Sequence, residues 1–220
     1  MIVIATNNGK KNLIELLSNL NTIDFNCSVS IIDTGSTDQE SIDFLESLKD
    51  NSNYKFKIEV HQTPYKGYDT GAYIYAINNI EAERYYFIQD SIRIKSINFF
   101  ELVDDKLQPG VVIPLVTFGS NLYDYQEQVD FCMKHFGECK FQKGTFGPMF
   151  FILKEDVNKI DKKYLVYPTN KSLQMGMERG WSVIFEKYNF NIDPLEGDYD
   201  YNKLMNDQYV HFKKLSQLRQ

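Results

Sequence analysis

The feature that most constrains this chain is the regular alternation of short apolar runs and amphipathic helices in its first half. Apolar runs over residues 2–5, 29–32 and 85–88 have the length of buried strands, and each leads into a polar loop. Between them, leucines and isoleucines recur at the spacing of a helix face. This order predicts an α/β fold with a mainly parallel central sheet flanked by helices.

The second half continues the pattern less regularly. We expect Gly180 to act as a C-terminal cap that ends one of the later helices. The remaining predicted elements are strands over 56–60, 111–116, 149–153 and 181–185, and helices ending near 80 and spanning 99–103, 170–180 and 202–217.

Composition narrows the functional classes. With 43% hydrophobic residues, a chain of 220 residues can bury its own core. The formal net charge of −6 comes without a basic face, which speaks against a nucleic-acid partner. Cys27, Cys132 and Cys139 show no paired metal spacing, so we expect inert thiols and a cytoplasmic protein. No apolar segment reaches the length of about 18 residues that a membrane-spanning helix requires.

An acidic loop, Asp-Thr-Gly-Ser-Thr-Asp at residues 33–38, follows the second predicted strand. In parallel sheets, ligands bind at the carboxyl ends of the strands. Asp33 could therefore accept hydrogen bonds from a base or a ribose. A well-made strand-to-helix turn, with Ser36 or Thr37 capping the next helix, explains the same loop without a ligand.

Gln89, Asp90 and Ser91 follow the fourth predicted strand. A cation that accompanies a diphosphate needs hard oxygen ligands, usually one or two carboxylates. Asp90 is therefore a candidate metal ligand. The alternative is a helix cap, in which Asp90 or Ser91 bonds the next backbone amides.

Residues 67–71, Gly-Tyr-Asp-Thr-Gly, open a predicted helix. Glycines at a helix start allow close approach to an anion, whereas Asp69 would instead bind a sugar hydroxyl, a ribose or the helix end. The phosphate-binding signatures of Walker and Rossmann proteins are absent, which speaks against nicotinamide and flavin enzymes.

Taken in order, these segments resemble the GT-A glycosyltransferases, in particular the large inverting family 2. Residues 2–8 are similar to the opening strand and turn of that family, and residues 33–38 to its second-strand loop. Residues 67–73 and 89–91 resemble the rhamnan-synthesis type of polysaccharide glycosyltransferase. The resemblance covers about residues 1–95.

The resemblance implies transfer of a sugar, with inversion, from a UDP- or dTDP-sugar to a glycan, lipid-linked or protein-linked acceptor. It implies one GT-A domain over residues 1–220, with a nucleotide-sugar half (1–95) and an acceptor half with the C-terminal tail (96–220). Mn²⁺ or Mg²⁺ would bind at Asp90, although its neighbours are neutral where metal-binding relatives usually carry acidic residues. The implied donor-binding residues are Thr6, Asn7, Asn8, Asp33, Gly67, Asp69, Gln89 and Asp90.

An inverting transfer needs a base that removes the proton of the acceptor hydroxyl. Glu178 is our candidate, because it stands on a predicted helix near the apolar Met175 and Met177, beside Arg179 and before Trp181. An ordinary surface salt bridge is the alternative interpretation of Glu178. The other candidates are Asp124, Asp130 and Glu138 for the base, and His211 for a further metal ligand.

Two other functions stay open at this stage. The chain could be a catalytically inactive GT-A-like module that binds a nucleotide sugar or a glycan. It could also be a nucleotidyltransferase, which would normally show a basic, glycine-rich loop after the first strand. Residues 8–11, Asn-Gly-Lys-Lys, give only a thin version of that loop.

Overall fold

The structure, a computed structural model, describes residues 1–49, 53–63, 67–118, 126–139, 144–145, 147–199 and 209–212 of the chain. Its helices are α1 (Lys10–Leu20), α2 (Gln39–Ser47), α3 (Tyr68–Asn79), α4 (Phe99–Lys106), α5 (Gln126–Phe136), α6 (Lys154–Val157) and α7 (Lys171–Lys187), with the 3₁₀ turn η2 (Lys162–Tyr164). Its strands are β1 (Ile2–Thr6), β2 (Val29–Asp33), β3 (Ile58–Gln62), β4 (Arg84–Gln89), β5 (Ile92–Ile94), β6 (Val111–Pro114), β7 (Thr117–Phe118), β8 (Gly144–Thr145), β9 (Phe150–Leu153), β10 (Asn191–Ile192), β11 (Asp198–Tyr199) and β12 (Val210–Phe212).

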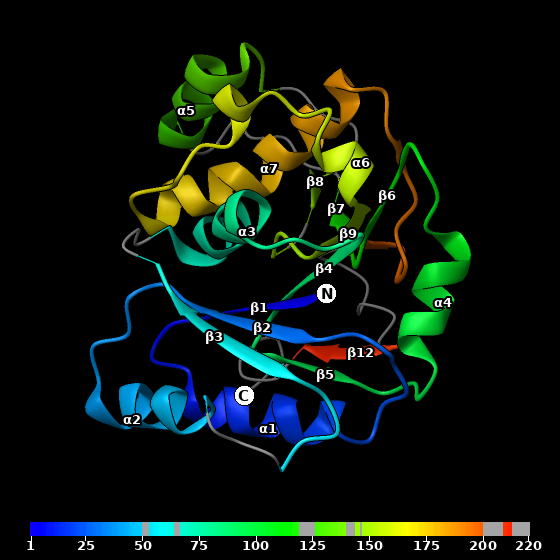
Figure 1. The fold of residues 1–220 in the computed structure, drawn as a ribbon. Helices are drawn as coiled ribbons and strands as arrows, with labels where there is room; N and C mark the ends of the chain where they lie inside the picture. The colour runs from blue at the N-terminus through cyan, green and yellow to red at the C-terminus, as the bar shows by residue number, and fades with distance from the viewer. Residues whose placement is uncertain are drawn as a thin grey trace.

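A seven-stranded sheet runs through the middle of the molecule in the order β10-β6-β9-β4-β1-β2-β3 (Figure 1). β3, β2, β1 and β4 pair in parallel, as do β6 and β10. β9 runs antiparallel to both of its neighbours, so the segment before it lies at the same edge as the carboxyl ends of the parallel strands. The predicted mainly parallel α/β sheet is confirmed.

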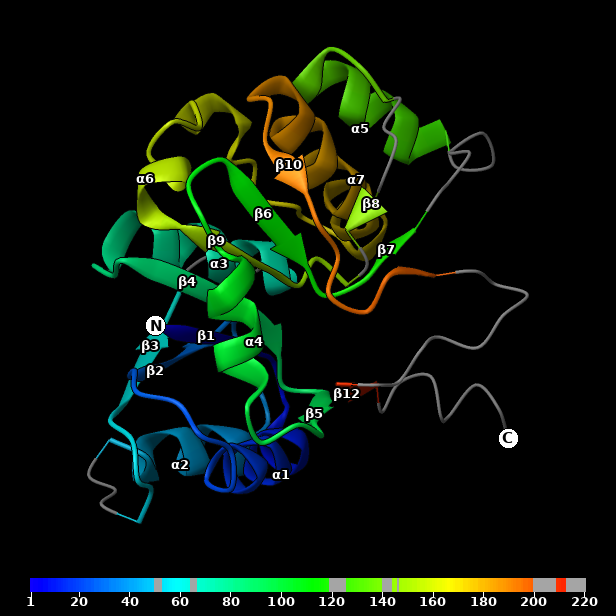
Figure 2. The ribbon, with the colours of Figure 1, turned by 90° about the vertical axis from the view of Figure 1, so that its right-hand side faces the viewer.

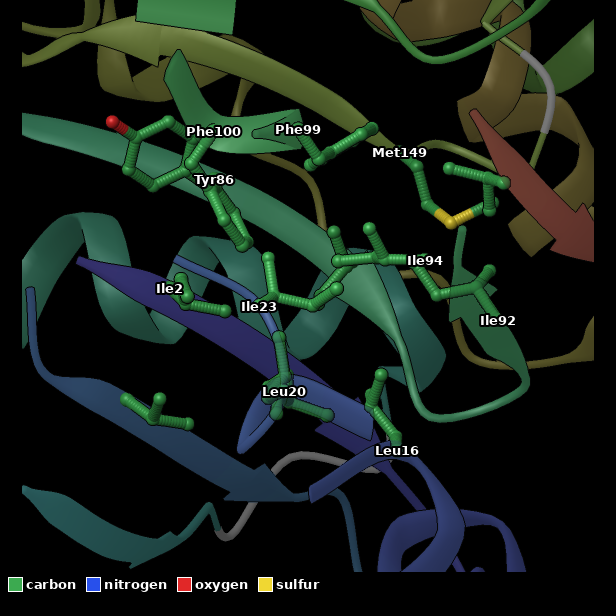
Figure 3. Packing of buried hydrophobic residues seen from close by; sticks show 14 of the residues in the cluster. Ile2, Leu16, Leu20, Ile23, Tyr86, Ile92, Ile94, Phe99, Phe100 and Met149 are labelled. Carbon is green, nitrogen blue, oxygen red and sulfur yellow. The ribbon is translucent and has the colours of Figure 1, made fainter. Parts of the chain in front are cut away.

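Successive side chains along a strand point to opposite faces of the sheet, and each face packs into its own hydrophobic core. On β1, Ile2 and Ile4 enter one core, whereas Val3 and Ala5 enter the other. Helices α1 and α2 cover the first face, and α3, α5 and α7 lie on the second (Figures 1 and 2). Figure 3 shows the first core, where aliphatic side chains of β1 and α1 lie near Tyr86 of β4. Because apolar packing on both faces holds the sheet in place, the edge that carries the polar loops is held in place too.

Helix α7 is longer than the sequence predicts. It continues through Gly180 to Lys187, so the predicted helix end at Gly180 and the predicted strand over 181–185 are wrong. The absence of a side chain at Gly180 serves packing, because a Cβ there would lie 2.6 Å from Cε2 of Phe136 on α5. The left-handed backbone at the end of the helix belongs to Asn189, whose φ is 55°.

Strand β12 pairs antiparallel with β5. The buried carboxylate of Glu196 anchors it by accepting hydrogen bonds from the backbone N–H groups of Tyr209 (2.6 Å) and Val210 (2.8 Å). A helix over 202–217 is therefore wrong for the part that the structure describes. Residues 202–208 and 213–217 of that predicted helix lie outside the described residues.

Candidate functional site

Three of the predicted site residues end neighbouring parallel strands. Thr6 ends β1 and is in register with Asp33, which ends β2. Gln89 ends β4 and is in register with Ala5, on the other side of β1. The carboxyl ends of parallel strands meet at one edge of a sheet, so the loops after these three residues come together.

Asp90 follows β4 and lies against the start of α1. The Thr6 hydroxyl donates a hydrogen bond of 2.7 Å to Asp90 Oδ2. Gly9, the N-cap of α1, leaves no room for a side chain, because a Cβ there would lie 2.0 Å from the same oxygen. The dipole of α1 favours a negative charge at this position. Strand β5 follows Asp90 closely, so its alternative role as the cap of a following helix is wrong.

Asp33 is buried and bonds within its own loop. The backbone N–H of Ser36 donates to Asp33 Oδ1 at 3.0 Å, and the Ser36 hydroxyl donates to the same oxygen at 2.6 Å. The N-cap of α2 is Asp38, whose side chain accepts from the N–H of Ser41, so the predicted capping by Ser36 or Thr37 is wrong. Asp33 therefore shapes the loop that it begins.

Asn7 and Asn8 connect the β1 loop to the β2 loop. Asn8 Oδ1 accepts from the N–H of Thr37 at 2.7 Å, and Asn7 Nδ2 donates to the carbonyl oxygen of Thr34 at 3.1 Å. A pocket of about 310 Å³ opens here, and the first residue of α3 forms part of its wall. The lining residues are Asn7, Asn8, Thr34, Gly35, Thr37 and Tyr68.

Gln89 ties three segments together at this edge. Its Nε2 donates to Asp69 Oδ2 at 2.6 Å and to the carbonyl oxygen of Gly147 at 2.8 Å. Its Oε1 accepts from the Ser91 hydroxyl at 3.3 Å. Both side-chain N–H groups are thus engaged within the protein, and they fix the first turn of α3 and the approach to β9.

Gly67, the N-cap of α3, is required by the packing of the helix's own first turn. A Cβ at Gly67 would lie 2.5 Å from Cα of Gly71. The backbone N–H of Gly71 also bonds the carbonyl oxygen of Gly67 at 2.5 Å. Gly67 therefore brings the helix start, with Asp69, close to the edge of the sheet.

Asp69 and Asp90 lie near the same buried group, the hydroxyl of Tyr73. Burial raises the pKa of Tyr73 well above its ordinary value, and the charges of both carboxylates raise it further. One or two carboxylates, completed by phosphate oxygens and water, suit Mg²⁺ or Mn²⁺. Asp90 and Asp69, which both act on the Tyr73 hydroxyl, are the carboxylates that could hold a cation shared with a bound diphosphate. Among the described residues, no group of three or more acidic, His or Cys side chains could hold a metal ion.

Helix α7 meets the first turn of α3 through Thr70. The backbone N–H of Thr70 donates to Gln174 Oε1 at 3.4 Å, and Trp181 Nε1 donates to the Thr70 hydroxyl at 3.4 Å. Glu178 is partly buried on α7, about one turn from each of these two partners. It therefore shares a helical stripe with residues that contact the segment carrying Asp69.

The other candidates for the base have different surroundings. Asp130 is exposed on α5 and accepts from Gln126 at 2.7 Å, and Glu138 forms an ion pair with Lys187 at 3.1 Å. Asp124 and the side chain of His211 lie outside the part that the structure describes.

Three residues of this site escaped the sequence interpretation: Gly9, Tyr68 and Gly147. The Asn-Gly pair at residues 8–9, between a strand and a helix, is a signal for close backbone approach that could have found Gly9. Gly147 takes part through its carbonyl oxygen, which carries no side-chain signal.

Solved structures with a similar fold include residues 1–349 of TarS from S. aureus in complex with UDP-GlcNAc. The TM-score is 0.54 with 16% identity, over 95% of this chain and 56% of that chain. A mannosyltransferase from Pyrobaculum calidifontis, in complex with GDP-Man and Mn²⁺, gives a TM-score of 0.58 with 13% identity, over 90% of this chain and 55% of that chain. Both are GT-A-type glycosyltransferases. The chain has the GT-A fold.

At this level of identity, the likeness concerns the GT-A fold alone. The chain spans 35% of the chain in a further solved structure of TarS and about half of the chains in the two structures above. A CMP:2-keto-3-deoxy-manno-octonic acid synthetase complexed with CTP is also similar, with a TM-score of 0.52 and 9% identity, over 100% of this chain and 96% of that chain. No protein-family model and no curated protein matches the chain. Within the described ranges of this chain, no helix is both long enough and apolar enough to cross a membrane.

Proposed function

We propose that the chain is a glycosyltransferase that moves a sugar from a nucleotide diphosphate donor to the hydroxyl group of an acceptor. The observation that carries this proposal is the meeting of Asp90, Asp69 and a pocket at one edge of a GT-A sheet. We call this edge, formed by the loops after β1, β2 and β4 and the first turn of α3, the donor edge. UDP-GlcNAc and GDP-Man occupy two proteins of the same fold, which supports a nucleotide sugar as the ligand.

The charged side chains at the donor edge indicate where each part of the nucleotide sugar would bind. The base and ribose would lie near Asn7 and Asp33, and the diphosphate near Asp90. Two carboxylates repel a diphosphate, so a cation must lie between the carboxylates and the diphosphate. Mn²⁺ or Mg²⁺ would supply that positive charge. Thr6 fixes one oxygen of Asp90, and Gln89 fixes one oxygen of Asp69, so both carboxylates are held before the ligand arrives.

On the acceptor side, we propose Glu178 as the base that takes the hydroxyl proton while the sugar–phosphate bond breaks. Its place on α7, between two residues that bond Thr70 of α3, supports this role. Inversion, a UDP- or dTDP-sugar donor and a glycan, lipid-linked or protein-linked acceptor in polysaccharide biosynthesis follow from the resemblance to family 2 and rhamnan-synthesis enzymes. In this proposal residues 1–95 serve the donor and 96–220 the acceptor.

We propose a cytoplasmic location on the state of the cysteines. Cys27, Cys132 and Cys139 are all free thiols. Burial raises the pKa of Cys132 to about 12, which makes it a poor nucleophile. Free thiols fit a reducing compartment.

A nucleotidyltransferase is the second candidate, favoured by the likeness to the CTP-bound synthetase. Such an enzyme needs cations near the triphosphate. After β1 the chain offers Lys10 and Lys11, and Lys10 already pairs with Glu40 at 3.2 Å. The scarcity of free basic side chains after β1 therefore favours the glycosyltransferase.

A donor screen separates these functions. We expect a UDP- or dTDP-sugar with Mn²⁺ to raise the melting temperature, since a ligand at 100 times its Kd stabilises the fold by about 2.7 kcal/mol. The same sugar should be hydrolysed slowly without an acceptor and transferred with one. Stabilisation by CTP alone would favour the nucleotidyltransferase. Binding without any hydrolysis or transfer would favour the inactive module, and no response to any nucleotide would contradict the proposal.

A further inference from the structure

Tyr68 has a backbone conformation that its residue type does not favour. Among the described residues, three besides glycine have positive φ: Asn8 (49°), Tyr68 (50°) and Asn189 (55°). Asparagine tolerates the left-handed region because its short polar side chain bonds locally, whereas a bulky residue is strained there. Such strain persists only where the surrounding structure enforces it, and it clusters at active sites and ligand-binding segments.

The side chain of Tyr68 does not serve the core. The exposed fraction of Tyr68 is 41%, whereas Thr70, Gly71 and Ala72, which follow it in the same helix, are buried. Gly67, directly before it, holds the helix start close to Gly71. The left-handed turn at Tyr68 therefore puts an aromatic ring at the surface, at the first position of α3.

Tyr68 lines the 310 Å³ pocket together with residues of the loops after β1 and β2. That volume is near the lower limit for small-molecule sites and suits one flat ring system with its attached sugar. Asn7, also in the wall, is exposed and carries an amide that can bond the polar edge of a base. The pocket thus combines a stacking face with a hydrogen-bonding group.

We propose that Tyr68 is a ligand-binding residue whose ring stacks on the base of the bound nucleotide. The inference rests on the proposed function, because it assumes that the pocket at the donor edge receives the nucleotide part of the donor. Stacking contacts the flat face of a base and leaves its edge to Asn7. The strain at Tyr68 is the cost of placing the ring there.

The test uses three variants and titration calorimetry with UDP, dTDP, GDP and inorganic pyrophosphate, each with Mn²⁺. Tyr68→Asn keeps the left-handed conformation and removes the ring, so UDP binding should weaken on the order of tenfold. Tyr68→Phe keeps the stacking face and should stay within about threefold of wild type. Pyrophosphate, which has no base, should bind all variants equally.

Melting temperatures separate a ligand-binding role from a structural one. Because asparagine relieves the strain, Tyr68→Asn should melt no lower than wild type while it binds UDP more weakly. A structural role predicts that both fall together. Asn189→Gly relieves a similar left-handed backbone conformation just after the C-terminal end of α7 and should leave UDP affinity unchanged.

Three outcomes overturn the assignment of Tyr68. They are wild-type UDP affinity in Tyr68→Asn, a melting temperature that falls along with binding, and an equal loss of pyrophosphate binding. In each of these cases the wild-type protein still binds a nucleotide, so the proposed function survives. If the wild-type protein binds none of the three nucleotides, the proposed function itself fails.

Discussion

The donor edge and the interface between α5 and α7 are shaped by different chemistry. At the donor edge, short polar side chains bond a neighbouring loop, as Asn8 bonds Thr37. At the interface, glycines of α7 make room for aromatic rings of α5, as Gly180 does for Phe136. Substitutions at the donor edge should therefore change ligand binding more than stability. Substitutions at the interface should change stability alone.

Glu178 would break this division, because it lies on α7 and yet is proposed to act on the acceptor. Glu178→Gln should lower kcat by about 10²–10⁴-fold, the usual contribution of a general base. Donor affinity should stay within about twofold, since the base touches the acceptor only. The measurements are kcat with an identified acceptor and donor affinity by calorimetry.

Glu186→Gln is the matched control, because Glu186 is also partly buried on α7. It should keep wild-type turnover. If Glu178→Gln also turns over within a few-fold of wild type, Glu178 is not the base, and Asp124 and Asp130 become the candidates.

Asp90 sharpens the comparison on the binding side. Losing an outer partner of a metal ligand already costs about 10–100-fold in metal affinity, so loss of the carboxylate itself in Asp90→Asn should cost at least as much. Mn²⁺ titrations of both proteins in the presence of UDP give the affinities. Thr6→Val, which removes the hydroxyl bonded to Asp90, should have a smaller effect in the same direction. Equal Mn²⁺ affinity in wild type and Asp90→Asn would remove Asp90 from the metal site.

The substitution Asp33→Ala should weaken nucleotide binding by about 1.5–3 kcal/mol, which is the range for a hydrogen bond to a charged group. Because Asp33 also holds Ser36, part of that loss could come from the loop. Ser36→Ala isolates the loop contribution, since it keeps the carboxylate. UDP affinities of both variants decide the matter: if the two lose equal affinity, Asp33 acts on the loop and not on the ligand.

The interface offers a pair of matched glycines for the smallest expected effect. Gly180→Ala would place a Cβ 2.6 Å from the ring of Phe136, and overpacking of this kind costs about 1–3 kcal/mol. Gly176→Ala would meet Phe131 at 3.1 Å, where the gain in helix propensity of about 1 kcal/mol offsets the contact. Denaturant unfolding should therefore show a loss of stability for Gly180→Ala and little change for Gly176→Ala. A change in UDP affinity in either variant would contradict the division between the two regions.

The same contrast explains what the sequence could predict. The strands that carry Thr6, Asp33 and Gln89 were predictable, because apolar runs followed by polar loops are signals within a few residues. The parallel sheet followed from their order. The functions of Asp90 and Asp69 could be proposed because their loops end strands or begin a helix in that sheet.

Other features depend on contacts between distant segments, which the local sequence does not encode. Gly180 has the local signature of a helix cap, and only the position of Phe136 shows that it is a packing residue. Ser36 is as good a cap by residue type as Asp38, and the choice depends on Ser36 bonding Asp33. The side-chain amide of Gln89 donates a hydrogen bond to the carbonyl oxygen of Gly147, which comes from the segment before β9.

The pairing of β5 with β12 has a consequence for how the protein is made. β5 follows Asp90, and its partner strand comes from far later in the chain. Ribosomes add about 5–20 residues per second, so β5 waits for seconds before residues 210–212 can reach it. During that time its edge presents unpaired backbone groups, which are templates for pairing with other chains. Synthesis of residues 210–212 therefore protects the nascent chain from aggregation at the strand beside Asp90.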